Sequence, residues 1–539
     1  MEQPKPAHLL LPRLMLRECR RSMFRSKVAD STGLNLTGGA VLLRSLVLRR
    51  LLQREVLAPD EKFVAVLLPP SAAAVVVNAC LTLMGRVPVN LNYTATSSVL
   101  KSCLEQCGIR HVLTSRKVMD KLKLELDVEL VYLEDFQPRI KKTDKLVAAA
   151  LVYLTPTAIL ERRLGLLRLR PDDLMTVIFT SGSTGDPKGV MLSYDNIGSN
   201  VEAIDRIIQL KPSDVLLGIL PFFHSFGYTV TLWTVLTLAP KGAYHFSPLD
   251  AHLVGKLTRE HEGTILIGTP TFLRSYVRRC PPEDFTSLEV VVAGAEKLPQ
   301  DLSAAFEERF GTRPVEGYGA TELSPLVACN IPASRAPTVG HLVSKEGTVG
   351  RPVPLVSAKI TDLDTGAQLG IDQPGMLWIR GPNVMQGYLN KPEMTAKVLV
   401  DGWYMTGDVA MLDADGFIKI TGRQSRFSKI GGEMVPHMKV EETLERIVGG
   451  GEEELKIAVT AVPDERKGER LVVVHTPLEK RPEQLVKDLA SAGLPNLWIP
   501  SPDSFVQVAE IPVLGTGKVD LKAVRQLALE KFGGAKTPK

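Results

Sequence analysis

The sequence predicts an α/β protein: a large N-terminal domain of parallel-sheet αβα subdomains with a β-rich subdomain, then a small α+β C-terminal domain. In the first half, short apolar runs typical of buried strands alternate with longer amphipathic stretches. After about residue 330, shorter strands with frequent Gly, Pro and Asp follow one another. A chain of 539 residues is also long enough to divide into two or more domains.

The alternation is clearest near the N-terminus. Residues 62–70 (KFVAVLLPP) are expected to form a buried strand, residues 71–85 a helix and residues 87–92 the next strand. The same texture returns at residues 288–296 (LEVVVAGAE). Repeated strand–helix–strand units predict largely parallel sheets.

A polar, basic connector bounded by glycines, residues 422–432 (GRQSRFSKIGG), marks the expected domain boundary. We therefore predict an N-terminal domain over residues 1–422, with its β-rich subdomain at about 331–422. A mobile C-terminal domain is predicted over residues 423–539.

Composition narrows the function classes. Hydrophobic and charged contents of 44% and 23% are ordinary for a globular protein, and a net charge of +5 is too mild to indicate nucleic-acid binding. Six scattered cysteines without a CxxC pair or a signal peptide favour a cytoplasmic location, with peripheral contact at the inner face of the membrane left open. Basic runs at 42–55 and 161–170 are interpreted as solvated helix faces. Docking to an acidic carrier protein or an anionic lipid surface is the alternative.

Two further features have a structural and a functional interpretation. Residues 146–160 are the most lipid-like segment, but they are too short to span a bilayer and contain Pro156. Packing under the neighbouring domain is favoured over lying on a membrane. Cys103, Cys107 and His111 are spaced to share one helix face. Packing is favoured over metal binding, because no fourth ligand is apparent.

Residues 178–192 (IFTSGSTGDPKGVML) are the most distinctive stretch. A strand at 173–180 is expected to end in a loop at its carboxyl end, where open α/β sheets bind ligands. The glycines of the loop let backbone N–H groups approach an anion, and its hydroxyls and Lys188 can contact phosphate oxygens. The spacing differs from a Walker A loop, which argues against a kinase or motor NTPase.

This stretch resembles the first signature of the acyl-adenylate-forming (AMP-binding) enzymes. Three further segments resemble the other signatures of that superfamily, in the same order: GYGATELSP (317–325), YMTGDVAMLDADGFIKITGR (404–423) and PVLGTGKVD (512–520). The resemblance implies activation of a carboxylate by ATP to an acyl-adenylate and pyrophosphate, followed by displacement of AMP by a thiol. ATP and Mg²⁺ are the implied cofactors.

The resemblance also implies roles for residues of this chain. Binding of ATP and AMP is expected from Thr180, Ser181, Gly182, Ser183, Thr184, Gly185, Lys188, Ala295, Glu296, Gly317, Tyr318, Gly319, Ala320, Asp408 and Arg423. Catalytic roles are expected for Lys518, Glu322, Thr321 and His224. The Mg²⁺ ligands are expected to be Glu322 and Thr184, and the acyl group and pantetheine are expected to meet His224, Gly294, Gly317 and Gly432.

Several of these roles are specific. Asp408 is expected to accept hydrogen bonds from the ribose hydroxyls, with Arg423 as a second ribose contact. Tyr318 is expected to cover the adenine, whereas a structural tyrosine is the alternative. Lys518, in a glycine-containing loop, is expected to bridge the carboxylate and the α-phosphate. The C-terminal domain is then expected to rotate about Arg426, where the superfamily usually has Asp or Lys.

The substrate prediction depends on residues 220–236 (LPFFHSFGYTVTLWTVL), the expected acyl wall. This segment contains no carboxylate that could pair with an ammonium group, which favours an apolar acid. His224 is interpreted as a gate residue, with a core histidine as the alternative.

The closest resemblance is to the synthetase half of the bacterial bifunctional acylglycerophosphoethanolamine acyltransferase/acyl-ACP synthetases, through segments such as SRFSKIGGEMV and LPNLWIP. It implies a long-chain fatty acid–ACP ligase. An H-x4-D pair, as an acyltransferase half requires, occurs only at His245 and Asp250 and is interpreted as chance, so any acyltransferase would be a separate partner. A fatty acid–CoA ligase is the nearest alternative, followed by a non-catalytic adenylate-binding protein or a membrane-docking protein.

Overall fold

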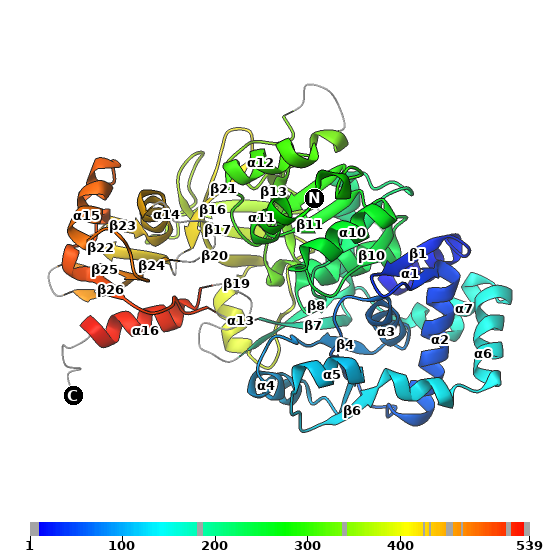
Figure 1. Cartoon of the computed structure of the whole chain (residues 1–539). Coiled ribbons are helices and arrows are strands. Elements are labelled where there is room, and N and C mark those ends of the chain that lie inside the picture. The colour runs from blue at the N-terminus through cyan, green and yellow to red at the C-terminus, as the bar shows by residue number, and fades with distance from the viewer. Residues whose placement is uncertain are drawn as a thin grey trace.

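The protein is described from a computed structural model covering residues 10–180, 187–336, 342–423, 426–430, 433–448, 456–464, 467–513 and 519–532. Sheets flanked by helices form the larger part of the molecule, and a separate small sheet with its own helices forms one end (Figure 1). The predicted α/β fold class is confirmed.

The largest sheet has nine strands in the order β15-β14-β13-β12-β11-β9-β10-β1-β2. Its strands from β13 to β1 are parallel, whereas β2, β14 and β15 at the edges pair antiparallel. The bounds are β1 Ser26–Asp30, β2 Asn35–Thr37, β9 Val215–Gly218, β10 Lys241–Tyr244, β11 Ile265–Gly268, β12 Val290–Ala293, β13 Val315–Gly319, β14 Leu326–Cys329 and β15 Arg351–Pro352. The helices that connect or cover its strands are α1 Leu11–Arg21, α2 Gly38–Glu55, α8 Tyr194–Ile208, η4 Phe226–Trp233, α9 Thr234–Thr237, α10 Ala251–His261, α11 Pro270–Arg279 and α12 Gln300–Phe310.

A second, four-stranded parallel sheet has the order β4-β3-β5-β6. The predicted strand–helix–strand unit is confirmed as β3 Phe63–Val66, α3 Ala72–Leu83 and β4 Val87–Asn90. The remaining elements of this part are α4 Ser97–Cys107, β5 His111–Thr114, α5 Arg116–Leu122, β6 Glu129–Tyr132, η1 Leu133–Arg139, α6 Lys142–Ala149, η2 Ala150–Leu154 and α7 Thr157–Arg163.

The strand before the phosphate loop differs from the prediction. It forms β7 (Leu174–Thr180), but β7 belongs to a small antiparallel sheet with β8 (Lys188–Ser193) and β18 (Gly387–Tyr388). The loop therefore connects a hairpin and does not follow a strand of an open parallel sheet. This sheet lies against the parallel strand β4, where the Thr176 hydroxyl donates to the Pro88 carbonyl at 2.8 Å.

Two mainly antiparallel sheets follow. The first comprises β16 Ser357–Thr361, β17 Gly375–Arg380, β19 Leu399–Val400, β20 Trp403–Leu412 and β21 Ile418–Arg423, with α13 Pro392–Val398 beside it. The second comprises β22 Phe427–Ile430, β23 Glu433–Pro436, β24 Ile457–Asp464, β25 Gly468–His475 and β26 Phe505–Gln507, with α14 His437–Val448, α15 Pro482–Ser491 and α16 Leu521–Phe532.

The buried apolar residues separate in the same way. One large cluster extends from Leu11 to Ile418, and a smaller one fills the four-stranded sheet region. The two clusters at the C-terminal end begin at Ile430 and Ala458 and share no residue with the others. In Figure 1 the elements from β22 onward lie at the opposite end of the molecule from α2, α6 and α7.

The apolar segment 146–160 packs by one face only. It forms the end of α6, the π-helical turn η2 and the start of α7, with Ala148, Val152 and Leu160 fully buried. Leu146 and Leu154 on the other face are 70% and 81% exposed. No helix among the described residues is both long and apolar enough to cross a bilayer.

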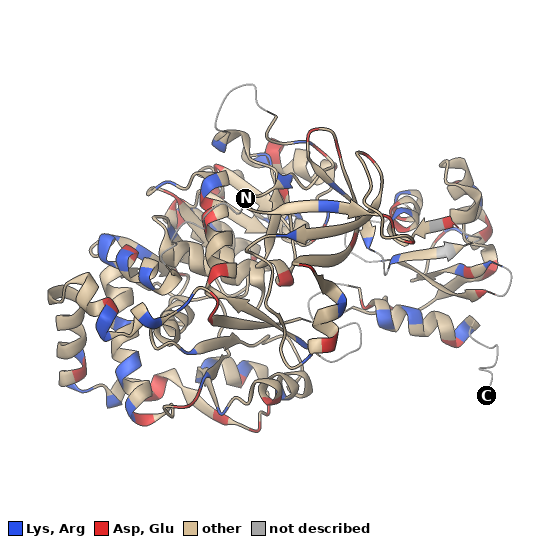
Figure 2. Cartoon of the chain, turned by 180° about the vertical axis from the view of Figure 1, so that it is seen from behind, with Lys and Arg blue, Asp and Glu red and all other residues tan. Residues whose placement is uncertain are grey.

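The basic runs are only partly exposed to solvent, and their Lys and Arg residues are blue in Figure 2. Arg50 and Arg54 of α2 both bind the buried Asp144 of α6, with nitrogen–oxygen distances of 3.0 Å, and hold the pKa of that carboxyl at about 2. In the second run, Glu161 is buried and accepts from arginines of α1, whereas Arg162 and Arg163 are exposed.

The expected helix face shared by Cys103, Cys107 and His111 is wrong. Helix α4 ends at Cys107 because Gly108 adopts a left-handed conformation, with φ of 60°. His111 begins β5, where its Nδ1 lies 2.9 Å from Glu61. Among the described residues, no group of three potential metal ligands gathers anywhere.

Candidate active site

The second signature forms a tight turn between two strands of the large sheet. β13 ends at Gly319, and a Cβ atom there would lie 2.1 Å from the Pro325 carbonyl oxygen, so only glycine fits. The Ala320 N–H donates to that same oxygen at 3.0 Å. This turn leads directly into the short helix η6 (Thr321–Leu323), which presents Thr321 and Glu322.

Glu322 is linked to the phosphate loop through a tyrosine. The Tyr388 hydroxyl donates to Glu322 Oε1 at 2.9 Å. Tyr388 pairs with Val190 next to the loop, and Lys188 Nζ lies 5.4 Å from the Tyr388 ring centroid. The first and second signatures, more than 130 residues apart, therefore meet through β18.

The ends of the phosphate loop are adjacent in space. Thr180, the last residue of β7, is the cross-strand partner of Lys188, the first residue of β8. Their side chains consequently lie on the same face of the hairpin. The predicted phosphate ligands Ser181, Gly182, Ser183, Thr184 and Gly185 lie outside the described residues.

The third signature forms a second polar centre. Asp408 of β20 is 3% exposed, and its Oδ1 lies 2.8 Å from Nε of its cross-strand partner Arg423. Its other oxygen accepts a hydrogen bond from the Tyr318 hydroxyl. Since a carboxylate can accept about four hydrogen bonds, Asp408 retains acceptor capacity for a ligand.

Three tyrosines surround these carboxylates. Burial raises the pKa values of Tyr318, Tyr388 and Tyr404 above the usual value for tyrosine, and the negative charges of Asp408 or Glu322 raise them further. The three hydroxyls therefore remain protonated at neutral pH, and those of Tyr318 and Tyr388 donate to the two carboxylates. Through its hydrogen bond to Asp408, Tyr318 connects the nine-stranded sheet to the third signature.

The segment at 294–296 lies next to the expected acyl wall. A Cβ atom on Gly294 would approach the Phe226 ring to 3.0 Å, and Gly317 O lies near the same position. Ala295 has a φ of 67°, an uncommon backbone conformation for a non-glycine residue. Glu296 accepts a hydrogen bond from the Thr271 hydroxyl at 2.8 Å. Its contact with the nucleotide stays a prediction.

Residues 220–236 lie between the sheet and the second signature. The Ser225 hydroxyl donates to Thr321 Oγ1 at 3.3 Å, and from Phe226 the chain forms the π-helix η4, an element frequent at functional sites. His224 is exposed and its ring lies 4.5 Å from that of Phe223, so the alternative of a core histidine is wrong.

The C-terminal predictions are described only in part. Arg426 is 9% exposed and forms an ion pair with Glu441 of α14, which fastens this position to the C-terminal sheet region. Lys297 Nζ lies 2.8 Å from Glu442 of the same helix, linking the 294–298 loop to that region. Gly432 and Lys518 lie outside the described residues.

The sequence analysis missed three residues of the candidate site: Tyr404, Ser225 and Tyr388. Tyr404 is in the third signature and Ser225 directly follows His224, so the sequence motifs could have indicated both. Tyr388 could not be found in this way, because nothing in the sequence indicates that the two-residue strand β18 pairs with β8.

The carboxylate oxygens of Glu322 are suitable ligands for a hard divalent cation. Its carboxylate is oriented by the Tyr388 hydroxyl, and among the described residues it has no ion-pair partner. Carboxylate oxygen is the ligand that Mg²⁺ prefers, together with substrate phosphates. The second predicted ligand, Thr184, lies in the loop outside the described residues.

Comparison with known proteins identifies relatives over most of this region. The family described as AMP-binding enzyme matches residues 17–389. A long-chain-fatty-acid–CoA ligase from Bacillus subtilis is 32% identical over 361 residues, which are 64% of this chain and 60% of the relative. A 3-[(3aS,4S,7aS)-7a-methyl-1,5-dioxo-octahydro-1H-inden-4-yl]propanoyl:CoA ligase from Rhodococcus jostii is 33% identical over 66% of this chain and 65% of the relative. The match thus spans less than two thirds of these relatives.

Solved structures are similar over nearly the whole chain. The anthranilate CoA ligase AuaEII in complex with anthranoyl-AMP has a TM-score of 0.79 at 19% identity, covering 98% of this chain and 99% of that one. ATP-bound MatB from Rhodopseudomonas palustris has a TM-score of 0.75 at 23% identity, covering 96% and 98%. The similarity at these identities concerns the fold.

Proposed function

The chain belongs to the AMP-binding enzyme family, and from this premise we propose that it is an acid–thiol ligase that activates a long-chain fatty acid. In the first step the carboxylate attacks the α-phosphate of ATP, giving acyl-AMP and pyrophosphate. In the second step a phosphopantetheine thiol attacks the acyl carbon and releases AMP.

The observation that carries the proposal is the connection Lys188–Tyr388–Glu322. Both reactants of the first step are anionic, so the site must supply positive charge and fixed donors. Lys188 supplies charge beside the phosphate loop, and Tyr388 holds the Glu322 carboxylate in one orientation. Mg²⁺ bound at Glu322 would supply the charge that neutralises the phosphates.

The ribose side is served by the second centre. Asp408 is fixed from both sides by Arg423 and Tyr318, so its free lone pairs are preorganised for two hydroxyl donors. Holding the nucleotide here positions the α-phosphate near Thr321 and Glu322, which lie on the turn that follows Tyr318. The proposed role is binding and orientation.

The acyl side is apolar. Phe226 under Gly294 and the buried π-helix η4 provide no charged group for a polar substrate head. A long-chain acid is also the substrate named for the Bacillus subtilis relative. His224, at the exposed start of this segment, is proposed as a gate residue.

We propose that the C-terminal domain rotates between the two steps, and two observations support this proposal. The core clusters do not cross residues 419–429, and Arg426 is attached to the C-terminal side through Glu441. We propose domains of 1–422 and 423–539, with the hinge at Arg426. Lys518 would act in the first step and Gly432 would contact the pantetheine in the second.

Two acceptors remain in competition. Coenzyme A is favoured by the names of the relatives, which are CoA ligases. Acyl carrier protein is favoured by the resemblance to acyl-ACP synthetases and by the exposed Arg162 and Arg163, which suit an acidic partner. The exposed Leu146 and Leu154 support peripheral membrane contact. A separate acyltransferase that consumes the product is proposed from the resemblance alone.

The test measures acyl-thioester formation from palmitate and ATP with holo-ACP or with CoA, using apo-ACP as the control. Thioester on holo-ACP, reduced about tenfold in kcat/KM by Arg162→Glu with Arg163→Glu but unchanged for CoA, supports the carrier-protein reaction. Thioester on CoA alone selects a CoA ligase. Absence of palmitate-dependent ATP–pyrophosphate exchange would overturn both.

A further inference from the structure

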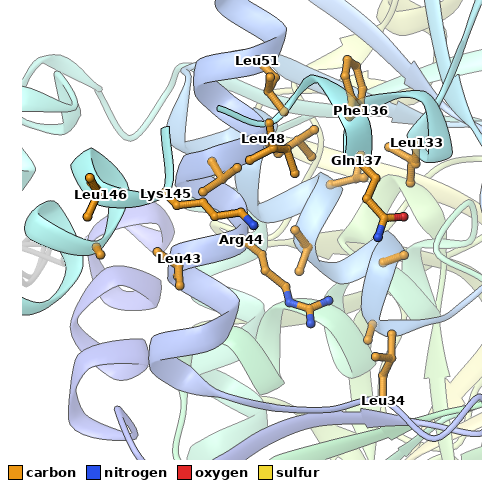
Figure 3. A pocket seen from close by; sticks show the side chains of 17 residues that line it. Leu34, Leu43, Arg44, Leu48, Leu51, Leu133, Phe136, Gln137, Lys145 and Leu146 are labelled. Carbon is orange, nitrogen blue, oxygen red and sulfur yellow. The ribbon is translucent and has the colours of Figure 1, made fainter. Parts of the chain in front are cut away.

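An apolar cavity lies in the N-terminal helical layer, away from the Glu322 and Asp408 centres. It has a volume of about 530 Å³, is partly open to solvent and is lined mainly by residues of α2, α3, η1 and α6 (Figure 3). Its walls are aliphatic and aromatic, including Leu48, Leu51, Val76, Leu133 and Phe136. No residue of the Glu322 or Asp408 centres lines it. Its size falls in the range of roughly 300–1,000 Å³ that is usual for small-molecule sites.

Of the described residues that line this apolar cavity, two are cationic and none is acidic. Arg44 of α2 and Lys145 of α6 both extend into it in Figure 3. Within the described chain neither side chain forms an ion pair. Asp144, which precedes Lys145 in the sequence, is bound by Arg50 and Arg54 and also accepts from the Lys141 N–H at 3.1 Å.

We propose that this cavity binds one long-chain amphiphile with an anionic head. The hydrocarbon chain would occupy the space between α2 and α3, where burial of its apolar surface stabilises the complex. The carboxylate or phosphate head would lie beside the exposed side chains of Arg44 and Lys145, which offer two positive charges to one anion. A neutral head gains no such attraction and a cationic head is repelled, so the charge of the head determines selectivity.

The entrance to the cavity is itself apolar. Leu146, which lines the cavity, is 70% exposed, and Val147 beside it is 40% exposed. Tyr153 and Leu154 on the following π-helical turn are 47% and 81% exposed. An amphiphile can thus enter from a lipid surface or from solution. A free fatty acid and an anionic lysophospholipid share the chemistry required.

The inference does not depend on the proposed function, because it concerns equilibrium binding without ATP or bond formation. If both hold, the cavity carries a second molecule of the substrate class away from the reacting atoms.

The experiment uses the delipidated full chain and the fluorescent probe cis-parinaric acid. The probe is titrated without nucleotide, and again with the catalytic cleft filled by a non-hydrolysable palmitoyl-sulfamoyl adenosine. We expect one equivalent of probe to remain bound in the second titration. Palmitate and palmitoyl-lysophosphatidylglycerol should displace it, whereas hexadecanol and hexadecyltrimethylammonium should require at least tenfold higher concentration. Whichever anionic competitor acts at the lower concentration identifies the source of the ligand.

Variants locate the bound probe. Arg44→Glu with Lys145→Glu should weaken probe binding at least tenfold, and Lys142→Glu is the matched control, because Lys142 is exposed on the same helix but does not line the cavity. Ala73→Phe, at an exposed lining position of α3, should block the chain without changing charge. Equal affinities for all variants, or no residual probe binding with the cleft filled, would overturn the inference. Palmitate-dependent pyrophosphate exchange, measured separately, reports on the proposed function.

Discussion

Glu322 and Asp408 each accept a hydrogen bond from a tyrosine hydroxyl, yet their surroundings differ. Asp408 is 3% exposed and is bound by Arg423 as well as Tyr318. Glu322 is half-buried and, among the described residues, is bound by Tyr388 without any cation. The negative charge of Asp408 is compensated by Arg423, whereas Glu322 has no ion-pair partner among the described residues, as the proposed Mg²⁺ site requires.

A third carboxylate shows what happens without such partners. Glu316 lies on β13, the strand that leads to Glu322, and burial raises its pKa to about 7. The backbone at Leu298 and the charge of Lys297 only partly offset this effect. The neighbouring groups that the fold supplies therefore decide whether each of these carboxylates is ionised, paired with a cation or protonated.

The largest loss of activity should follow replacement of the carboxylate of Glu322 or of Asp408 by an amide. Glu322→Gln should lower palmitate-dependent ATP–pyrophosphate exchange about 10²- to 10³-fold, because a charge-stabilising group is lost, with little change in the thermal unfolding midpoint. Asp408→Asn should also lower activity, and it should destabilise the fold by about 1–3 kcal/mol, because Arg423 and Tyr318 lose a charged acceptor. Equal stability losses in the two variants would contradict the comparison.

A smaller effect should separate the two tyrosines. Tyr388→Phe removes the group that orients Glu322, so kcat should fall about tenfold and more Mg²⁺ should be needed for half-maximal rate. Tyr318→Phe should instead raise KM for ATP and leave the Mg²⁺ requirement unchanged. Initial rates across an ATP and Mg²⁺ grid measure both quantities. A shift of the Mg²⁺ dependence by Tyr318→Phe would show that the two centres are not separate.

The sequence predicted the parts of the molecule whose signals are local. The unit β3–α3–β4 was visible because its apolar runs have the length and spacing of buried elements. Glu322 and Asp408 were found because they lie within short signatures. Tyr388 was missed, because its role depends on a pairing between β18 and β8 across almost 200 residues. The antiparallel setting of β7 was missed for the same reason, since strand direction is a property of tertiary contacts.

The sequence also could not show that Arg44 and Lys145 of the apolar cavity form no ion pair among the described residues. The run at 42–55 contains four arginines whose spacing does not reveal that Arg50 and Arg54 bind Asp144 while Arg44 does not. Only the packing of α6 against α2 distinguishes them. The exposure of Leu146 and Leu154 depends on that packing as well.

The smallest expected effect concerns Glu316 and has a defined pH window. The folded state holds a proton on this carboxyl up to about pH 7, whereas the unfolded chain releases it near the usual value of about 4.5. Between these pH values the folded state binds more protons, so the free energy of unfolding should fall as pH rises, by about 1–3 kcal/mol in all. Glu316→Gln should remove this part of the slope in thermal unfolding midpoints measured from pH 4.5 to 8. Glu308→Gln, at an exposed position of α12, should keep it. A Glu316→Gln profile that follows the parent chain would mean that this carboxyl is ionised in the fold and has a partner of its own.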